Sequence, residues 1–293
     1  MELVIKVLYV VFPVFSIMGL GYLLSHFKKL DIEPVLEILL YLTIPAFVIS
    51  SLLKRETAAK ELFLIAVAVC FVVLFVGLLT KLYIKISGKE HIRDIYLPTM
   101  FMNTGNIPFP VALLAFGEEG LSIAVVYYVA LSMLVYSLGI YIAKGKDGMG
   151  EMFKLPLIYA AAIGIALNLL HAHPPEPVLK TFDMLGAATI PVMLVCLGYQ
   201  LRNTKLADIK TSLSAVGIRM FGGVLAAIII IKVLGITGLT AKIIILSSSM
   251  PSAVITFVFS HRYKMDSSLV ASIVALSTVI SIITVPLILL FLI

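Results

Sequence analysis

Long apolar runs alternate with short charged segments from one end of the chain to the other. A helix that crosses a bilayer needs about 20 mostly apolar residues. We predict ten such runs, at residues 3–24, 33–53, 61–86, 95–115, 119–143, 154–172, 178–200, 209–234, 240–260 and 268–292. The pattern therefore predicts an all-α polytopic membrane protein with ten transmembrane helices.

The composition excludes several functional classes. Of the 293 residues, 61% are hydrophobic and 13% are charged, whereas globular proteins carry about 25% charged residues. The net charge of +6 is spread over the loops, so nucleic acid is not an expected partner. The sequence contains no pair of acids deep in an apolar run and no metal-binding spacing of Cys or His. We therefore expect no enzyme activity, no cofactor and no metal site.

Lysine and arginine are distributed unevenly between alternate loops. If the N-terminus lies outside, the inner loops hold 14 of these residues and the outer loops hold 7. Because inner loops are enriched in Lys and Arg, we expect a multi-pass protein of the cell (plasma) membrane with both termini outside. The loop at residues 144–154 would then lie inside.

Short motifs recur at a nearly constant offset along the chain. Thr43-Ile44-Pro45 returns as Thr189-Ile190-Pro191, and the four residues 129–132 return as residues 274–277. These matches predict two five-helix repeats, at residues 1–145 and 146–293. Five is an odd number, so the second repeat enters the membrane from the opposite side. Inverted repeats of this kind are typical of secondary transporters.

The fourth and ninth apolar runs contain residues that interrupt a helix. The fourth reads Asn103-Thr104-Gly105-Asn106-Ile107-Pro108-Phe109-Pro110, and the ninth contains Ser247-Ser248-Ser249-Met250-Pro251-Ser252. Proline removes a backbone hydrogen bond and clashes with the preceding turn. We expect Asn106 to cap a new half-helix that has Pro108 in its first turn, and Ser249 to do the same before Pro251.

Two half-helix N-termini that meet near the midplane create a site for an anion, because both dipoles present their positive ends there. Secondary transporters bind substrates at such breaks. The residues predicted to contribute to substrate binding are Asn103, Asn106, Pro108, Pro110, Ser249, Pro251, Ser252 and Thr256. On the helical faces around Pro45 and Pro191, further residues are candidates for lining the path: Thr43, Phe47 and Ser50 in the first repeat, and Thr189, Met193 and Gln200 in the second. Helix packing through small and hydroxyl residues explains this second set equally well.

The chain as a whole resembles the auxin efflux carrier family, whose prokaryotic members are described as carriers of malonate or related acids. The resemblance is carried by short motifs in a specific order: Ile44-Pro45, Asn103-Thr104-Gly105-Asn106 followed by Pro110, Ile190-Pro191, and Met250-Pro251-Ser252-Ala253-Val254. It implies a fold similar to that of bile acid–sodium symporters. Helices one, two, six and seven would form a scaffold, and helices three to five and eight to ten a transport domain. Helices four and nine would cross at their breaks. The substrate would be a small organic anion such as a mono- or dicarboxylate, or an auxin-like acid. An elevator-type movement would carry it in the direction of efflux.

Two positions depart from the family pattern. Pro108 stands where family members often have Gly, and Ile255 stands where they often have Asn. The second departure removes an expected polar contact, for which Thr256 is a substitute. We expect Arg219, about a third of the way into the eighth run, to extend to the inner surface; the alternative is that its charge balances a substrate anion.

Several alternatives stay open at this stage. A ten-helix exporter of the drug/metabolite type shares the five-plus-five arrangement, and an anion channel also uses polar breaks. Sodium held by carbonyls, Asn and hydroxyls at the breaks is a further open question. The expected partners are a small organic anion and the lipid bilayer, with a second copy of the chain as a candidate for a homodimer.

Overall fold

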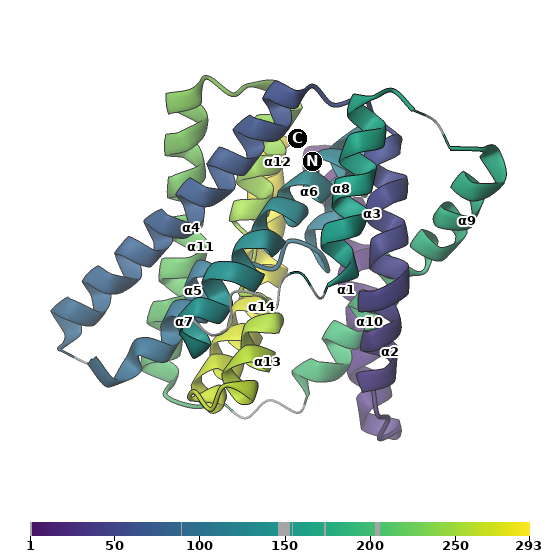
Figure 1. Ribbon diagram of the computed structural model, residues 1–293. Helices are drawn as coiled ribbons and strands as arrows, with labels where there is room; N and C mark the ends of the chain where they lie inside the picture. Colours follow the sequence, from purple (N-terminus) through teal and green to yellow (C-terminus); the bar gives the residue numbers. More distant parts are fainter. Residues whose placement is uncertain (1, 89, 146–152, 154, 173, 203–205) are drawn as a thin grey trace.

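A computed structural model describes residues 2–88, 90–145, 153, 155–172, 174–202 and 206–293. These residues form a bundle of helices (Figure 1). The helices of the first half are α1 (Glu2–Phe27), α2 (Glu33–Ile38), η1 (Leu39–Thr43), α3 (Ile44–Leu53), α4 (Ala59–Ser87), η2 (Glu90–Ile95), α5 (Tyr96–Met100), α6 (Pro108–Leu134), η3 (Val135–Gly139) and α7 (Ile140–Lys144). Those of the second half are α8 (Pro156–Leu169), α9 (Glu176–Ala187), α10 (Thr189–Leu201), α11 (Ile209–Leu234), α12 (Gly238–Ser248), α13 (Ile255–Arg262) and α14 (Ser267–Leu292).

Seven helical segments of the described chain are long and apolar enough to cross a membrane. They support the prediction of an all-helical, multi-pass membrane protein. The count differs from ten for local reasons: α8 and α12 are short, and the fourth and ninth runs are interrupted. In addition, α6 continues through a non-helical Gly117 (φ 71°, ψ −167°), so that two predicted runs become one segment. Ten crossings and the inverted repeat stay predictions, and the expected repeat boundary falls beside residues 146–152, outside the described part of the chain.

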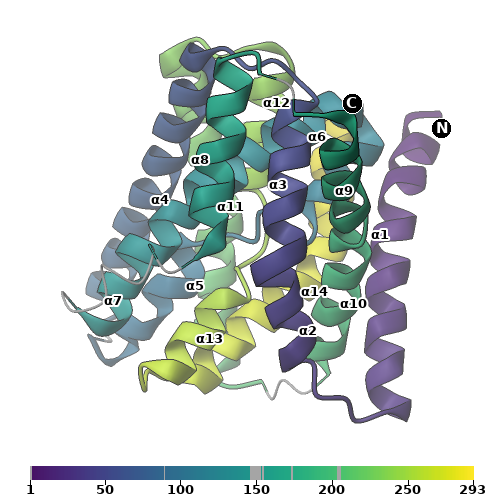
Figure 2. The same ribbon diagram turned by 45° about the vertical axis from the view of Figure 1, so that its right-hand side comes forward.

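Two groups of helices pack within the bundle. In one group, α1 packs along α10, and α3 packs along α8 and α9. In the other, α4 packs along α11, and α12 packs against α6 and α11. Both termini lie at the same end of the molecule, the upper end in Figures 1 and 2. An even number of crossings would produce this arrangement.

Glycines allow the close approach of α1 and α10. A Cβ atom at Gly198 would lie 1.8 Å from the carbonyl oxygen of Met18, and one at Gly21 would lie 2.2 Å from that of Val195. Small residues drive helix association in membranes because they let the backbones touch. These two glycines therefore fix the spacing of this helix pair.

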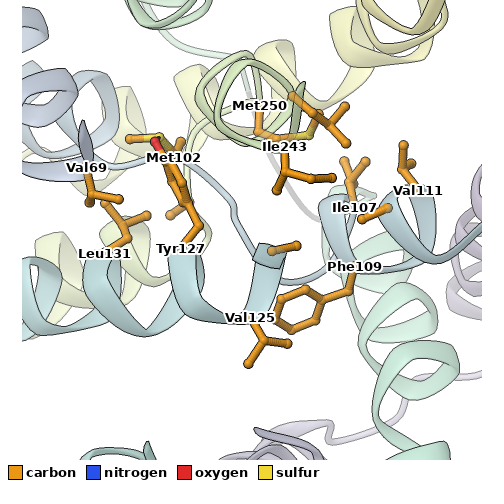
Figure 3. Close-up of a cluster of buried hydrophobic side chains, with 14 of the residues drawn as sticks. Val69, Met102, Ile107, Phe109, Val111, Val125, Tyr127, Leu131, Ile243 and Met250 are labelled. Atoms are coloured by element: carbon orange, nitrogen blue, oxygen red, sulfur yellow. The ribbon is translucent and has the colours of Figure 1, made fainter. Parts of the chain in front are cut away.

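A continuous apolar core surrounds the interrupted helices. Met102, Ile107 and Met250, which belong to the two interruptions, are buried in the same cluster as Ile243 of α12. Figure 3 shows these side chains together with Tyr127, whose hydroxyl group lies 3.4 Å from the sulfur of Met102. The unwound segments are thus packed against apolar side chains within the protein, where irregular backbone at membrane depth is tolerated.

Candidate functional site

The predicted interruption of the fourth run is present between α5 and α6. α5 ends at Met100, the backbone of Phe101 is extended (φ −107°, ψ 117°), and α6 begins at Pro108. Pro108 and Pro110 have no N–H group, so the first turn of α6 cannot extend backwards through regular helical bonds. The prolines thus place the start of the second half-helix.

The ninth run is interrupted in the same way between α12 and α13. α12 ends at Ser248 and α13 begins at Ile255. In Figures 1 and 2, α12 occupies the upper half of the bundle and α13 the lower half. Pro251 lies in the extended stretch between them rather than in the first turn of α13.

The two interruptions bind each other through their backbones. Met102 and Ser252 form an isolated antiparallel bridge. On one side of it, the N–H of Asn103 donates to the carbonyl of Pro251 (2.7 Å). On the other side, the N–H of Ala253 donates to the carbonyl of Phe101 (3.0 Å). Unwound backbone groups that would otherwise lack partners are thereby paired within the protein. We call this arrangement the crossing.

The capping residues differ from those that the sequence predicted. The N-cap of α6 is Ile107, and no side chain caps it. The Oδ1 atom of Asn103 instead accepts a hydrogen bond from the N–H of Asn106 (3.1 Å), so Asn103 organises the turn that leads into α6. Ser249 is the C-cap of α12 and donates backwards to the carbonyl of Leu246 (2.7 Å). The cap-x-Pro interpretation was therefore wrong at the second break. At the first break Pro108 begins α6 as predicted, but Asn106 does not cap the helix.

The buried hydroxyl groups of the second break are committed to backbone oxygens. Ser252 Oγ donates to the carbonyl of Pro98 (2.6 Å), and Thr256 Oγ1 donates to that of Ala253 (2.6 Å). Ser249 Oγ is committed in the same way. These three hydroxyls fix the backbone of the crossing, and direct contact of any of them with a substrate stays a prediction.

A cavity of about 140 Å³ adjoins the crossing. Its polar side chains come from the first break and from the helical segment after Gly117: Asn103, Thr104, Asn106, Tyr128, Ser132 and Tyr136. The second break contributes the apolar residues Ala253 and Val254. Leu40 of η1 and Met193 of α10 close it from the other group of helices. Both π-helical segments contribute to the lining, because Leu40 belongs to η1 and Tyr136 to η3. We call this space the crossing cavity.

One residue that lines this cavity carries a buried donor without a partner. The Nδ2 atom of Asn103 is buried and has no hydrogen-bond partner among the described residues. Asn103 itself is 5% exposed. Leaving a buried amide unpaired is costly, and such groups in folded proteins usually have a ligand, an ion or water as a partner. Asn103 therefore offers a vacant N–H donor to the crossing cavity.

The crossing cavity continues toward the end of the molecule opposite the termini. A second cavity, of about 520 Å³, shares Leu40, Asn106 and Val254 with it and reaches Asp31. A third, of about 540 Å³, extends from Gln200 to His261. Together they form a path between α2, α10 and α13 from the crossing to the loops at that end.

Ion pairs join the two helix groups at the end that carries the termini. Lys54 lies 3.5 Å from Glu118 and 3.7 Å from Asp183. Arg55 binds Glu61 through two hydrogen bonds (2.9 and 3.3 Å) and lies 3.3 Å from Glu119. These side chains are partly exposed, so each pair contributes little by itself. The end of the molecule that carries the termini is thus joined by several ion pairs, whereas the cavities lead to the opposite end.

Arg219 corrects another expectation. It does not extend to a surface: the residue is fully buried. Its Nη1 atom donates to the carbonyls of Thr99 (2.9 Å) and Met100 (3.1 Å), and its Nη2 atom donates to that of Ser248 (3.0 Å). These carbonyls lie at the C-terminal ends of α5 and α12. Arg219 thus binds the crossing from the side of α11.

Some of the candidate path residues pack against other helices, and others line a cavity. The ring of Phe47 packs against that of Phe109 of α6 in a tilted arrangement, with centroids 5.1 Å apart and an angle of 41° between the planes. Ser50 donates a short hydrogen bond to Asp183. Thr43 is buried without a hydrogen-bond partner for its hydroxyl among the described residues. Gln200 lines the path toward the loops. Met193, which the sequence placed among the path candidates, lines the crossing cavity. The hydroxyl of Thr189 is buried without a hydrogen-bond partner among the described residues. Leu40 and the tyrosines of the crossing cavity carry no signal that separates them from ordinary core residues of an apolar run.

A multi-pass helical protein with two broken helices that cross beside a small cavity has the architecture of a membrane transporter. The family described as membrane transport protein matches residues 6–152 and 146–289 of the chain. The chain belongs to this family, and its resemblance to the auxin efflux carriers is confirmed. It is similar to an uncharacterized transporter of Methanocaldococcus jannaschii (28% identity over 276 residues, 86% of each chain). It is also similar to an uncharacterized transporter of Methanothermobacter thermautotrophicus (26% identity over 290 residues, 94% of this chain and 95% of that one).

Proposed function

We propose that the protein is a secondary transporter that binds a small organic anion, such as a mono- or dicarboxylate, in the crossing cavity. The observation that carries this proposal is the vacant Nδ2 donor of Asn103 in a cavity formed where two half-helices begin. A cavity of about 150 Å³ accommodates a molecule the size of benzene. The crossing cavity, at about 140 Å³, is therefore matched to a small carboxylate.

The electrostatics of the cavity favour an anion. Val254 and Ile255 stand at the N-terminus of α13 and line the cavity, where helical bonding leaves N–H groups without carbonyl partners. The dipole of α13 adds partial positive charge at the same point. None of the described lining residues carries a negative charge that would repel a carboxylate.

The packing of the helices suggests how the anion would move. The group of α1, α3, α8 and α10 would serve as a scaffold, and the group around α4, α6, α11 and α12 as a transport domain. The crossing cavity lies at the contact of the two groups, with Met193 on one side and Asn103 on the other. A sliding movement of one group along the other would close the present path and open the opposite end, as in an elevator-type mechanism.

The orientation follows from the charge distribution. With both termini outside, the path at the end opposite the termini opens to the cytoplasm. The partly exposed ion pairs of Lys54 and Arg55 would then close the outer side. A substrate that enters from the cytoplasm fits an exporter. A location in the plasma membrane and assembly as a homodimer remain expectations from the sequence.

Counterflow in proteoliposomes tests the proposal. Thermal-shift measurements over a series of small carboxylates, malonate included, identify a ligand. Vesicles loaded with that acid should then accumulate the radiolabelled acid transiently and with saturation. A current that rises linearly with concentration, without exchange, would instead identify a channel.

A further inference from the structure

Arg219 is a fully buried cation that contacts the crossing but does not line the crossing cavity. Its guanidinium group donates to the carbonyls of Thr99, Met100 and Ser248 at distances of 2.9 to 3.1 Å. Thr99 and Met100 are the last residues of α5, and Ser248 is the last residue of α12. A single side chain therefore joins the C-terminal ends of the first half-helix of each break.

The C-terminal ends of helices carry partial negative charge and unpaired carbonyl oxygens. Two such ends that converge inside a membrane protein require a cation, because buried carbonyls without partners are costly there. In transporters with discontinuous helices, a sodium ion commonly takes this position between half-helix carbonyls. Here the guanidinium of Arg219 occupies those oxygens.

We propose that Arg219 is the resident cation of the crossing and takes the place of a coupling sodium ion. The inference deepens the proposed function, on which it rests in assigning the crossing to transport. Arg219 is a positioning residue: by holding the ends of α5 and α12, it sets the distance between Asn103 and Val254, which face the crossing cavity. The crossing then forms without a dissociable cation.

The surroundings of Arg219 leave room for the two terminal nitrogens of its guanidinium, whereas its Nε atom is buried without a hydrogen-bond partner among the described residues. A Cβ atom at Gly223 would lie 2.1 Å from Nη2 of Arg219 and 2.1 Å from the carbonyl oxygen of Ser248, so any side chain there would displace the contact. The hydroxyls of Tyr127 and Ser248 are 2.8 Å apart and share a hydrogen bond, which fixes the residue that accepts from Arg219.

The charge of Arg219 has no acidic partner within ion-pair distance among the described residues. The partial negative charges at the C-terminal ends of α5 and α12 offset only part of it, because α5 is a helix of five residues, and the crossing keeps a positive potential. An anion bound in the neighbouring cavity would be attracted by that potential. A fixed cation would thus serve both the geometry of the crossing and its preference for anions.

Thermal unfolding of the purified protein tests this assignment without any substrate, so its result is independent of the proposed function. The wild type and Arg219→Ala are compared in choline chloride, sodium chloride and guanidinium chloride at equal, low ionic strength. A sodium ion bound with its site about 99% filled would raise the Tm by about 5 °C or more. We expect the wild-type Tm to be the same in choline and sodium.

Arg219→Ala should unfold about 5–10 °C lower in choline, because it exposes three buried carbonyls to an empty space. Guanidinium, and to a smaller extent sodium, should restore part of the loss by filling that space. Lys210→Ala, which removes an exposed cation of the same helix, is the matched control and should show neither the loss nor the rescue. If Arg219→Ala cannot be purified, Arg219→Lys keeps the charge, and its smaller loss should respond to guanidinium in the same direction.

Three results would overturn the assignment. Stabilisation of the wild type by sodium over choline would mean that a sodium site exists beside Arg219. An Arg219→Ala protein with the wild-type Tm would mean that the carbonyls need no cation. A loss of Tm that neither small cation reverses would mean that Arg219 contributes only packing.

Discussion

Asn103→Asp separates the two roles that the structure gives to Asn103. The substitution keeps the shape of the side chain and an oxygen that can accept from the N–H of Asn106, where the distance is now 3.1 Å. It removes the Nδ2 donor that faces the crossing cavity and replaces it with a carboxylate oxygen. Asn103→Ala removes both functions and serves as the matched comparison.

The expected magnitudes follow from the contacts. A hydrogen bond to a charged group contributes about 1.5–3 kcal/mol, so loss of the donor should weaken binding of a carboxylate by about ten- to a hundredfold, since each 1.4 kcal/mol is a factor of ten. Repulsion between two carboxylates adds to this loss in Asn103→Asp. Loss of the turn-capping acceptor costs about 1 kcal/mol, which should lower the Tm of Asn103→Ala but not that of Asn103→Asp.

The assay combines thermal unfolding without ligand and titration with the carboxylate found by thermal shift. We expect Asn103→Asp to unfold at the wild-type temperature and to bind at least about ten times more weakly. Asn103→Ala should lose both stability and affinity. An Asn103→Asp protein that binds the carboxylate as tightly as the wild type would refute the assignment of Asn103 as the anion donor.

Three further predictions concern the packing, the orientation and the closed end. Gly198→Ala should lower the Tm by about 2–10 °C because its Cβ would overlap the carbonyl of a residue in α1; Gly217→Ala, which has no atom within 4 Å of its Cβ, should leave the Tm unchanged or raise it slightly. In a cysteine-free background, an impermeant thiol reagent added to intact cells should label Lys180→Cys but not Lys210→Cys, and the reverse pattern would invert the orientation. Lys54→Gln removes a cation shared by two carboxylates and should change the rate of counterflow about two- to fivefold; an unchanged rate would show that these pairs do not bias the transport cycle.

The interruptions were predictable because their causes are local. Pro108, Pro110 and Pro251 lack the N–H group that a regular helix needs, and the segments around them also contain Asn, Gly or Ser. Proline alone would not have sufficed, because Pro13 and Pro286 lie inside the continuous helices α1 and α14. The pairing of the two breaks was predicted from the internal repeat, which itself stays a prediction. For the same reason, Asn103 and Asn106 could be assigned to the site from their place beside the prolines.

The finer roles depend on packing that a single segment does not encode. Asn103 and Asn106 have identical side chains three residues apart, and only the path of the backbone decides which one caps the turn. The partners of Arg219 are up to 120 residues away in the sequence. A long cationic side chain in an apolar helix can reach a surface or a buried carbonyl, and the arrangement of α5, α11 and α12 decides between them.

The number of crossings illustrates a related limit. Hydrophobicity identifies runs of apolar residues. At Gly117 the chain turns with a positive φ, but only this one residue is non-helical, so α6 continues through it. Conversely, α12 and α13 together form one predicted run that is divided by six non-helical residues. The length of an apolar run therefore does not show whether two runs form one helix or whether one run is divided into two helices.

The most direct test of the account is the location of a bound carboxylate in an experimental structure. A bromine-bearing small carboxylate that competes with the transported acid can be placed by its anomalous scattering. The account predicts a single strong peak in the crossing cavity, with the carboxylate oxygens within hydrogen-bond distance of Asn103 Nδ2 and of the N–H groups at the start of α13. A peak beside His261 in the third cavity, or beside Arg219, with the crossing cavity empty, would contradict the account.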